Sequence, residues 1–241
     1  MSGKTNEKMR LDKFLVSTGS VTRSEAIKLC RTGNVTVNGR AEKDSSVKID
    51  PVKDTVFLCG KEVEYRKYTY IMMNKPEGVV SATEDGDTTV IDLLPQELRR
   101  IGLFPCGRLD KNTHGFVLLT NNGELAHFLL SPKHHVKKKY YFETKFPLSS
   151  EDKTSLEGGV DIGGYTTAPC EVELIGEKKA VITLTEGKYH QIKRMLDAVG
   201  NKITYLERVT FGPLVLDSSL DRGEWRALTN EEITALRDAA K

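Results

Sequence analysis

The stretch Gly107-Arg108-Leu109-Asp110-Lys111-Asn112-Thr113-His114-Gly115-Phe116-Val117-Leu118-Leu119-Thr120 is a polar loop that leads directly into an apolar strand. Such a loop holds a side chain at the edge of a sheet, where the strand fixes it and an adjacent cleft can admit a ligand. Asp110 is the carboxylate in this position. An aspartate that only turns the chain would have the same local sequence, so other segments must decide between these interpretations.

A second segment, Lys133–Lys139, contains four lysines and two histidines within seven residues, and Tyr140-Tyr141 follows it. These cations would repel one another without an anionic partner, and phosphate is a natural one. Aromatic rings next to a basic run favour base stacking. A solvated loop is the alternative. His134 and His135 are adjacent, so on a strand they would face opposite sides and make a poor metal pair.

A third segment runs from Glu186 to Leu196. Ile192, Met195 and Val199 form an apolar helical stripe, which most simply faces the core. Lys193 and Arg194 lie in the first turns of the same predicted helix. A cation at this position can point back into a cleft and keep a carboxylate ionised.

The body that contains these segments mixes strands and helices without regular alternation, so we predict an α+β fold with a largely antiparallel sheet. The first strand, Tyr70–Met73, ends before Pro76. Further strands are expected at 115–120, 140–145, 170–174, 180–185 and 209–216, and helices at 124–130, 191–199 and 230–239.

The front of the chain predicts a separate small domain of two helices and a hairpin. Thr22-Arg23-Ser24-Glu25 is a capping box that opens the second helix, with Arg23, Lys28 and Arg31 left on its outer side. Asn38-Gly39 is a strong hairpin signal. We therefore divide the chain into a small front domain at 1–60, a linker at 61–68 and a larger body at 69–241.

Charge and composition agree with a basic front end on a soluble body. Residues 1–60 carry 11 Lys and Arg against 7 Asp and Glu, and the remainder carries 25 against 27. No apolar run approaches the roughly 20 residues of a membrane span, and residues 1–10 do not resemble a signal peptide. We expect a cytoplasmic protein. The four cysteines lack metal or disulfide spacing, so we interpret them as buried reduced thiols.

The front domain resembles the S4 RNA-binding domain. The resemblance rests on Arg10-Leu11-Asp12-Lys13-Phe14-Leu15, on Arg23-Ser24-Glu25-Ala26 and on Gly33-Asn34-Val35-Thr36-Val37-Asn38-Gly39, and it covers about residues 9–57. It implies that the second helix lies against structured RNA, with Arg23, Lys28 and Arg31 at phosphates.

The body resembles RNA pseudouridine synthases. Arg108-Leu109-Asp110 with Thr113-x-Gly115, Lys138-x-Tyr140 and Gly187-x-x-x-Gln191-Ile192-Lys193-Arg194 match the family's three motifs in order. Asn74-Lys75-Pro76-x-Gly78 and Leu206-x-Arg208-x-x-x-Gly212 also match. The resemblance implies Asp110 as the catalytic aspartate, Tyr140 as the active-site tyrosine and Lys193 as the basic partner of the aspartate, where many relatives carry arginine.

Segments such as Tyr189–Met195 and Gly223-Glu224-Trp225-Arg226 are most similar to the branch that modifies 16S ribosomal RNA. This implies a uridine 516-type target in 16S ribosomal RNA, met within a small-subunit assembly intermediate, and a monomeric enzyme.

The further cations that we expect to contact RNA are Arg108, Lys137, Lys138, Arg194 and Arg208.

The reaction that the resemblance implies conserves all atoms of uridine, so it needs no cofactor and no metal. A hydrolytic glycosidase would usually show two carboxylates, and no second acid stands out beside Asp110. Three alternatives remain open: a non-catalytic RNA-binding assembly factor, a synthase for 23S ribosomal RNA, and a glycosylase that releases uracil.

Overall fold

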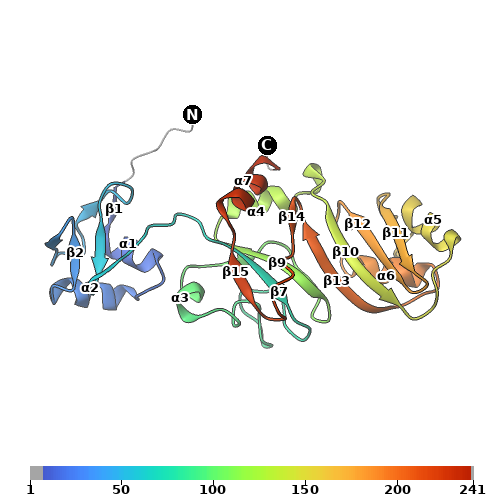
Figure 1. Cartoon of the computed structure of the whole chain (residues 1–241), viewed down its shortest axis with the longest axis horizontal. Coiled ribbons are helices and arrows are strands. Elements are labelled where there is room, and N and C mark those ends of the chain that lie inside the picture. The colour runs from blue at the N-terminus through green and yellow to red at the C-terminus, as the bar shows by residue number, and fades with distance from the viewer. Residues whose placement is uncertain (1–7, 240–241) are drawn as a thin grey trace. The chain divides into compact units, whose positions relative to one another are not determined.

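The computed structural model describes residues 8–239, and the chain divides into two compact units (Figure 1). The first unit contains the chain up to Thr69 together with Leu94–Leu103. The second contains Tyr70–Leu93 and the chain from Phe104 onward. The segment Leu94–Leu103 therefore groups with the front of the chain although it is far from it in sequence.

The first unit is built from short elements. They are β1 (Met9–Arg10), α1 (Leu11–Ser17), α2 (Arg23–Arg31), β2 (Val35–Val37), β3 (Arg40–Ala41), β4 (Lys48–Ile49), β5 (Val56–Leu58), β6 (Lys61–Glu62) and α3 (Gln96–Arg99). Four strands form a sheet in the order β3-β2-β5-β6, and β1 pairs with β4. The predicted hairpin turn is confirmed between β2 and β3, where Asn38 and Gly39 both have positive φ, 52° and 79°.

Helix α2 has the amphipathic form that the sequence predicts. Thr22 and Glu25 form the reciprocal capping box, while Ala26 and Cys30 are buried in the core with residues of α1 and β5. Arg23, Lys28 and Arg31 are exposed. Arg23 also approaches the buried carboxylate of Asp12, with Nη2 3.3 Å from Oδ2. The cationic side of α2 is therefore available to an anionic ligand.

The second unit is built on one mixed sheet of nine strands. Seven follow the order β11-β12-β10-β13-β9-β7-β15, with β14 paired to β13 and β8 to β9. Their bounds are β7 (Tyr70–Lys75), β8 (Phe104–Pro105), β9 (His114–Thr120), β10 (Lys138–Thr144), β11 (Glu171–Gly176), β12 (Lys179–Leu184), β13 (Ile203–Phe211), β14 (Leu214–Val215) and β15 (Trp225–Ala227). Among these named strands, β13 and β9 form the parallel pair and the rest pair antiparallel. The α+β prediction with a largely antiparallel sheet is confirmed.

Gly115 is required where β9 and β13 meet. Its φ is 98°, and a Cβ atom there would lie 2.4 Å from the Arg208 carbonyl oxygen. Only glycine accepts both this backbone conformation and this close approach. The parallel pairing that Gly115 permits fixes the start of β9, directly after the Asp110 loop.

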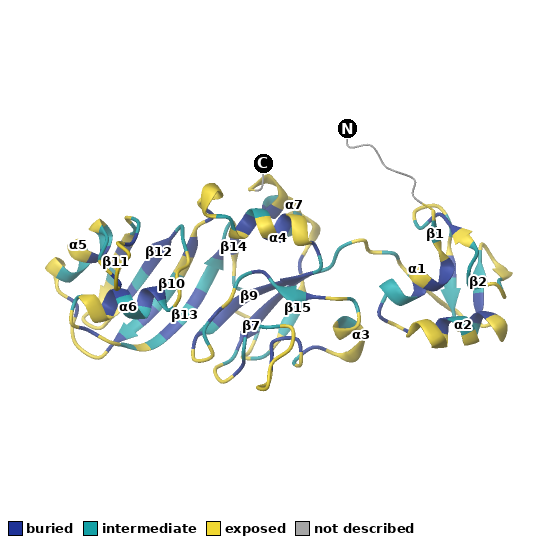
Figure 2. Cartoon of the chain, turned by 180° about the vertical axis from the view of Figure 1, so that it is seen from behind, coloured by how far each residue is buried: buried dark blue, intermediate teal, exposed yellow. Residues whose placement is uncertain are grey.

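The helices of the second unit are α4 (Gly123–Leu130), η1 (Pro132–His134), α5 (Ser150–Gly158), α6 (Gln191–Ala198) and α7 (Asn230–Asp238). Residues of α5 and α6 pack with β10, β12 and β13 in one apolar cluster, which includes Leu156, Ile192, Met195, Phe142 and Leu206. Strands β7 and β9 are buried along nearly their whole length, as Figure 2 shows in dark blue.

Two sequence expectations need correction. The predicted strand at 209–216 is the end of the longer β13, followed by a turn at Gly212 and the short β14. The turn arises because Gly212 has a φ of 58°. In addition, the Cys59 side chain is exposed rather than buried, whereas Cys30 and Cys106 are buried; all four cysteines are free thiols.

No helix among residues 8–239 combines the length and the apolar character that spanning a bilayer requires. Within the same described range, no group of three or more His, Cys, Asp or Glu side chains is arranged to hold a metal ion.

Candidate active site

Asp110 lies in the loop before β9, and the backbone on both sides of it is held by buried side chains. On one side, the Ser81 hydroxyl donates to the Leu109 carbonyl and accepts from the Leu109 amide, each at 3.1 Å. Ser81 is itself buried. Behind Asp110, the Thr113 amide donates to the Asp110 carbonyl at 3.0 Å. The carboxylate therefore projects from a fixed backbone.

On the other side of Asp110, the loop is held by Lys75, a fully buried lysine at the end of β7. Its ammonium donates to the carbonyl oxygens of Pro76 at 2.9 Å, Thr113 at 2.9 Å and Lys111 at 3.2 Å. Burial lowers the pKa of Lys75 to about 8, while the negative charges of Asp110 and Glu77 oppose that shift. Lys75 therefore holds the loop that follows β7 against the loop that precedes β9, through the backbone carbonyls of both loops.

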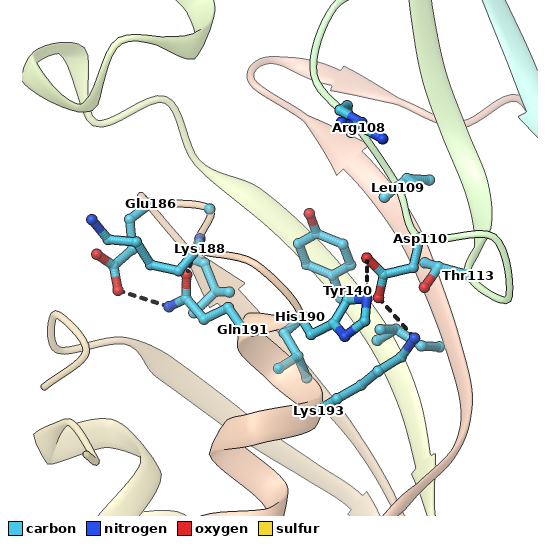
Figure 3. A pocket seen from close by; sticks show the side chains of 14 residues that line it. Arg108, Leu109, Asp110, Thr113, Tyr140, Glu186, Lys188, His190, Gln191 and Lys193 are labelled. Atoms are coloured by element: carbon cyan, nitrogen blue, oxygen red, sulfur yellow. Dashed lines mark hydrogen bonds and ion pairs between the residues drawn. The ribbon is translucent and has the colours of Figure 1, made fainter. Parts of the chain in front are cut away.

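The Asp110 carboxylate has a cationic or ionisable neighbour at each oxygen. Lys193, near the start of α6, places Nζ 2.7 Å from Oδ2, and His190 places Nε2 3.6 Å from Oδ1 (Figure 3). Lys193 also donates to the Asn112 side-chain oxygen. The Asp110 and Lys193 side chains are 26% and 22% exposed, so the pair is sheltered but still reachable from the cleft.

A pocket opens beside this carboxylate. Tyr140 from β10 lines it together with Asp110, and the apolar side chains of Leu184, Ile192 and Leu206 complete that part of the wall. Tyr140 also packs on the apolar cluster beneath. An aromatic ring and aliphatic side chains next to one carboxylate suit a planar polar ligand such as a nucleobase.

A short loop before α6 forms another wall of the pocket. The Glu186 carboxylate accepts hydrogen bonds from the Gln191 side chain at 2.7 Å, the Tyr165 hydroxyl at 2.7 Å and the Ala168 amide at 3.0 Å. Gln191 is buried and its side-chain oxygen accepts from the Lys188 amide at 2.9 Å. These bonds fix the course of the loop, so Glu186 is already engaged and is a poor second catalytic acid.

The cations predicted to contact RNA fall into two groups. Arg108 is exposed and lines the pocket that contains Asp110. Lys137 is exposed and pairs with Glu171 at 2.8 Å. Arg194 is half-buried, and its guanidinium lies against Gly163. These three remain compatible with a contact to RNA.

Lys138 and Arg208 are instead buried, which the sequence prediction did not anticipate. The Lys138 ammonium donates to the Val136 carbonyl at 2.9 Å, and burial lowers its pKa. The Arg208 Nε donates to the Phe116 carbonyl at 2.7 Å, and its guanidinium lies over the Phe211 ring. Both side chains support the sheet, so the expectation that they reach RNA as exposed cations is corrected.

Sequence reasoning did not single out three residues of the site. Lys75 was noted only as part of a motif, although a lysine between a buried strand and a proline is a usable signal of burial. The sequence around Ser81 contains no signal that this side chain is buried. His190 lies in the third segment, where no role was assigned to it. Its contact with Asp110 depends on a left-handed backbone at the helix start, with φ 50°, which spacing does not reveal.

Comparison with known proteins gives matches over both parts of the chain. The model of the RNA pseudouridylate synthase family matches residues 69–198, and that of the S4 domain matches residues 9–56. A Bacillus subtilis protein named as an uncharacterized RNA pseudouridine synthase is 48% identical over 236 residues, which cover 95% of this chain and 99% of the relative.

Two further likenesses agree with this family. The ribosomal small subunit pseudouridine synthase A of Escherichia coli strain K12 is 35% identical over 230 residues, covering 95% of this chain and all of the relative. A solved crystal structure of a pseudouridylate synthase has a TM-score of 0.67 at 36% identity, covering 95% of this chain and 99% of that one. From its sequence and its fold, this chain belongs to the RNA pseudouridylate synthase family and carries an S4 domain at its front.

Proposed function

We propose that this protein isomerises one uridine of small-subunit ribosomal RNA to pseudouridine, with Asp110 as the catalytic carboxylate. The observation that carries the proposal is the contact of 2.7 Å between Asp110 Oδ2 and Lys193 Nζ beside Tyr140 in one pocket. Lys193 occupies one carboxylate oxygen and neutralises part of its charge. The other oxygen, Oδ1, lies 3.6 Å from His190 Nε2, which is too long for a hydrogen bond, so we propose that this oxygen faces a bound sugar.

The reaction breaks the N1–C1′ bond of uridine, turns the uracil and forms a C5–C1′ bond, after which the C5 proton is lost and N1 gains one. C1′ is electron-poor between the two steps. An ionised carboxylate can bond to it or stabilise its charge, and both roles need one free oxygen on a fixed side chain. The backbone clamps from Ser81 and Lys75 meet the second requirement.

Tyr140 is proposed to pack on the uracil while it is detached from the sugar, and its phenol is within the same pocket for the C5 proton. Arg108 at the rim of that pocket is proposed to enter the RNA stack and hold the target nucleotide flipped out. Unstacking costs about a few kcal/mol, so a side chain that replaces the missing base lowers the cost of exposing the uridine.

The choice of substrate is supported by relatives and by charge. The relatives of Escherichia coli and Vibrio cholerae are both named ribosomal small subunit pseudouridine synthase A, at 35% and 38% identity over nearly their full lengths. The exposed cations of α2 favour a polyanion. We propose a uridine 516-type target in an assembly intermediate, recognised by a cytoplasmic monomer in which the front domain captures RNA and the second unit carries the active site.

The proposal is tested with Asp110→Asn, which keeps the size of the side chain and removes its charge. Wild type should release tritium from 5-tritiated uridine in a 16S ribosomal RNA fragment, and Asp110→Asn should bind the same RNA but release none. Lys111→Met, one residue away with an exposed side chain, is the matched control and should keep its activity. Turnover by Asp110→Asn near the wild-type rate would overturn the catalytic assignment.

The same assay separates the alternatives. Free uracil in the chromatographed products would indicate a glycosylase, and binding without any reaction by wild type would indicate an assembly factor. Mapping pseudouridine in ribosomal RNA from cells that lack the protein distinguishes a 16S from a 23S target.

A further inference from the structure

Tyr189 has the greatest exposure of any large apolar side chain among the described residues, 76%. Scattered exposed apolar residues are ordinary, so this alone marks no site. The Tyr189 ring, however, lies nearly flat on the His190 imidazole, with centroids 3.8 Å apart and an interplanar angle of 20°. The stack fixes the orientation of the tyrosine ring and covers one of its faces, while its high exposure leaves the other accessible.

His190 connects this ring to the active site. It lies immediately before α6 with a left-handed backbone, φ 50° and ψ 34°, a conformation that histidine adopts more readily than most residues. This backbone turns the imidazole toward the pocket, where Nε2 lies 3.6 Å from Asp110 Oδ1 (Figure 3). The two stacked rings therefore extend from the carboxylate at the pocket to the outer surface of the protein.

The charges around the pocket favour a polyanion. Arg108, Lys188 and Lys193 all line it, and Lys188 is fixed over the Tyr165 ring at 4.1 Å from its centroid. Tyr189 lies in the chain between Lys188 and His190, which both line the pocket. A tyrosine ring with one free face beside the cations of this pocket is a stacking surface for a nucleobase, because every base offers a π-face and the phosphates of the RNA backbone are attracted by the cations.

We propose that Tyr189, backed by His190, is a stacking site for a base of the substrate RNA that neighbours the target uridine. This inference rests on the function proposed above, because a uridine held at Asp110 leaves its neighbours along the strand at the rim of the pocket. Tyr189 positions the RNA and takes no part in bond making. Its loss weakens capture of RNA and leaves the chemical step unchanged.

The experiment compares wild type, Tyr189→Phe and Tyr189→Ala in the full chain, with a 16S ribosomal RNA fragment as substrate. Base stacking on an aromatic ring predicts that Tyr189→Ala raises KM by between about fivefold and a hundredfold at nearly constant kcat, whereas Tyr189→Phe stays within about twofold. Phe146→Ala removes another exposed aromatic ring, 49% exposed and away from the pocket lining. This control should leave KM unchanged.

A direct readout is the fluorescence of 2-aminopurine placed in turn at the nucleotides on either side of the target. Wild type and Tyr189→Phe should quench it at one position on binding, and Tyr189→Ala should not. If Tyr189→Ala keeps the wild-type KM and quenching while wild type makes pseudouridine, the stacking site is refuted and the proposed function stands. If wild type quenches the probe but makes no pseudouridine, the proposed function fails and the stacking site stands.

Discussion

Replacement of Lys75 by methionine tests how the Asp110 loop is held. The substitution removes an ammonium that donates to three carbonyl oxygens and keeps the length of the side chain. The Lys111 carbonyl still accepts from the Gly78 amide at 2.9 Å, so its loss is small. The carbonyls of Pro76 and Thr113 would face an apolar side chain instead.

Each buried carbonyl left without a donor destabilises the fold by about 1–3 kcal/mol. The variant no longer buries a charge, which offsets part of this cost. We therefore expect the free energy of unfolding to fall by about 2–4 kcal/mol in total. For a chain of this size, that loss lowers the melting temperature by about 5–15 °C. Differential scanning calorimetry measures it. Lys111→Met is the control, because the Lys111 side chain is 53% exposed and pairs with an equally exposed Asp87, and it should shift the melting temperature by less than about 4 °C.

The pH dependence gives a second measure of the same group. The pKa of Lys75 is about 8 in the folded protein and about 10.4 in an unfolded chain. Between these values the unfolded state binds more protons than the folded state, so this lysine adds stability as pH rises. The stability gap between wild type and Lys75→Met should therefore widen from pH 8 to pH 10. A melting temperature of Lys75→Met within 2 °C of wild type would refute the clamp, and a gap that narrows over this range would refute the lowered pKa of Lys75.

Two further predictions concern the cations. Lys193→Met should lower the single-turnover rate by about 10- to 100-fold, because Asp110 loses the contact that orients it. Lys193→Arg keeps a cation at this position and should retain most of the rate. Equal rates for both variants would contradict the orienting role. The triple variant Arg23→Ala, Lys28→Ala, Arg31→Ala should bind RNA less tightly and reduce the slope of log affinity against log salt by up to about 2–3. Filter binding measures this slope, and the control is a triple alanine variant at exposed lysines outside α2. An unchanged slope in the α2 variant would exclude α2 from RNA capture. The control lysines are Lys48, Lys53 and Lys61.

The features that could be predicted from sequence are those that depend on neighbours along the chain. The capping box of Thr22 and Glu25 and the turn at Asn38-Gly39 form as expected because their hydrogen bonds and backbone angles are set within four residues. The position of Asp110 between a loop and a strand belongs to the same class. Its proximity to Lys193, 83 positions later, followed from the family resemblance and has no local signal.

The burial of Lys138 shows why the rest could not be read from sequence. A lysine within a run of cations looks exposed, but β10 begins at Lys138 and a strand sends alternate side chains to opposite faces. Lys138 pairs in register with Leu184 on one side and Phe211 on the other, so its side chain enters the interior while Lys137 and Lys139 remain outside. The strand boundary and its partners decide the outcome, and composition contains neither.

Lys75 and Lys193 show how one carboxylate can use two lysines for different purposes. Lys75 is fully buried and bonds to backbone oxygens, so the carbonyls offset part of its desolvation and its effect is on the shape of the loop. Lys193 is partly exposed and bonds to the carboxylate itself, where a ligand can still approach. A group that holds backbone can be sealed away from solvent, whereas one that holds a reacting carboxylate must stay at the cleft. It follows that changes at Lys75 should act mainly on stability and changes at Lys193 mainly on rate.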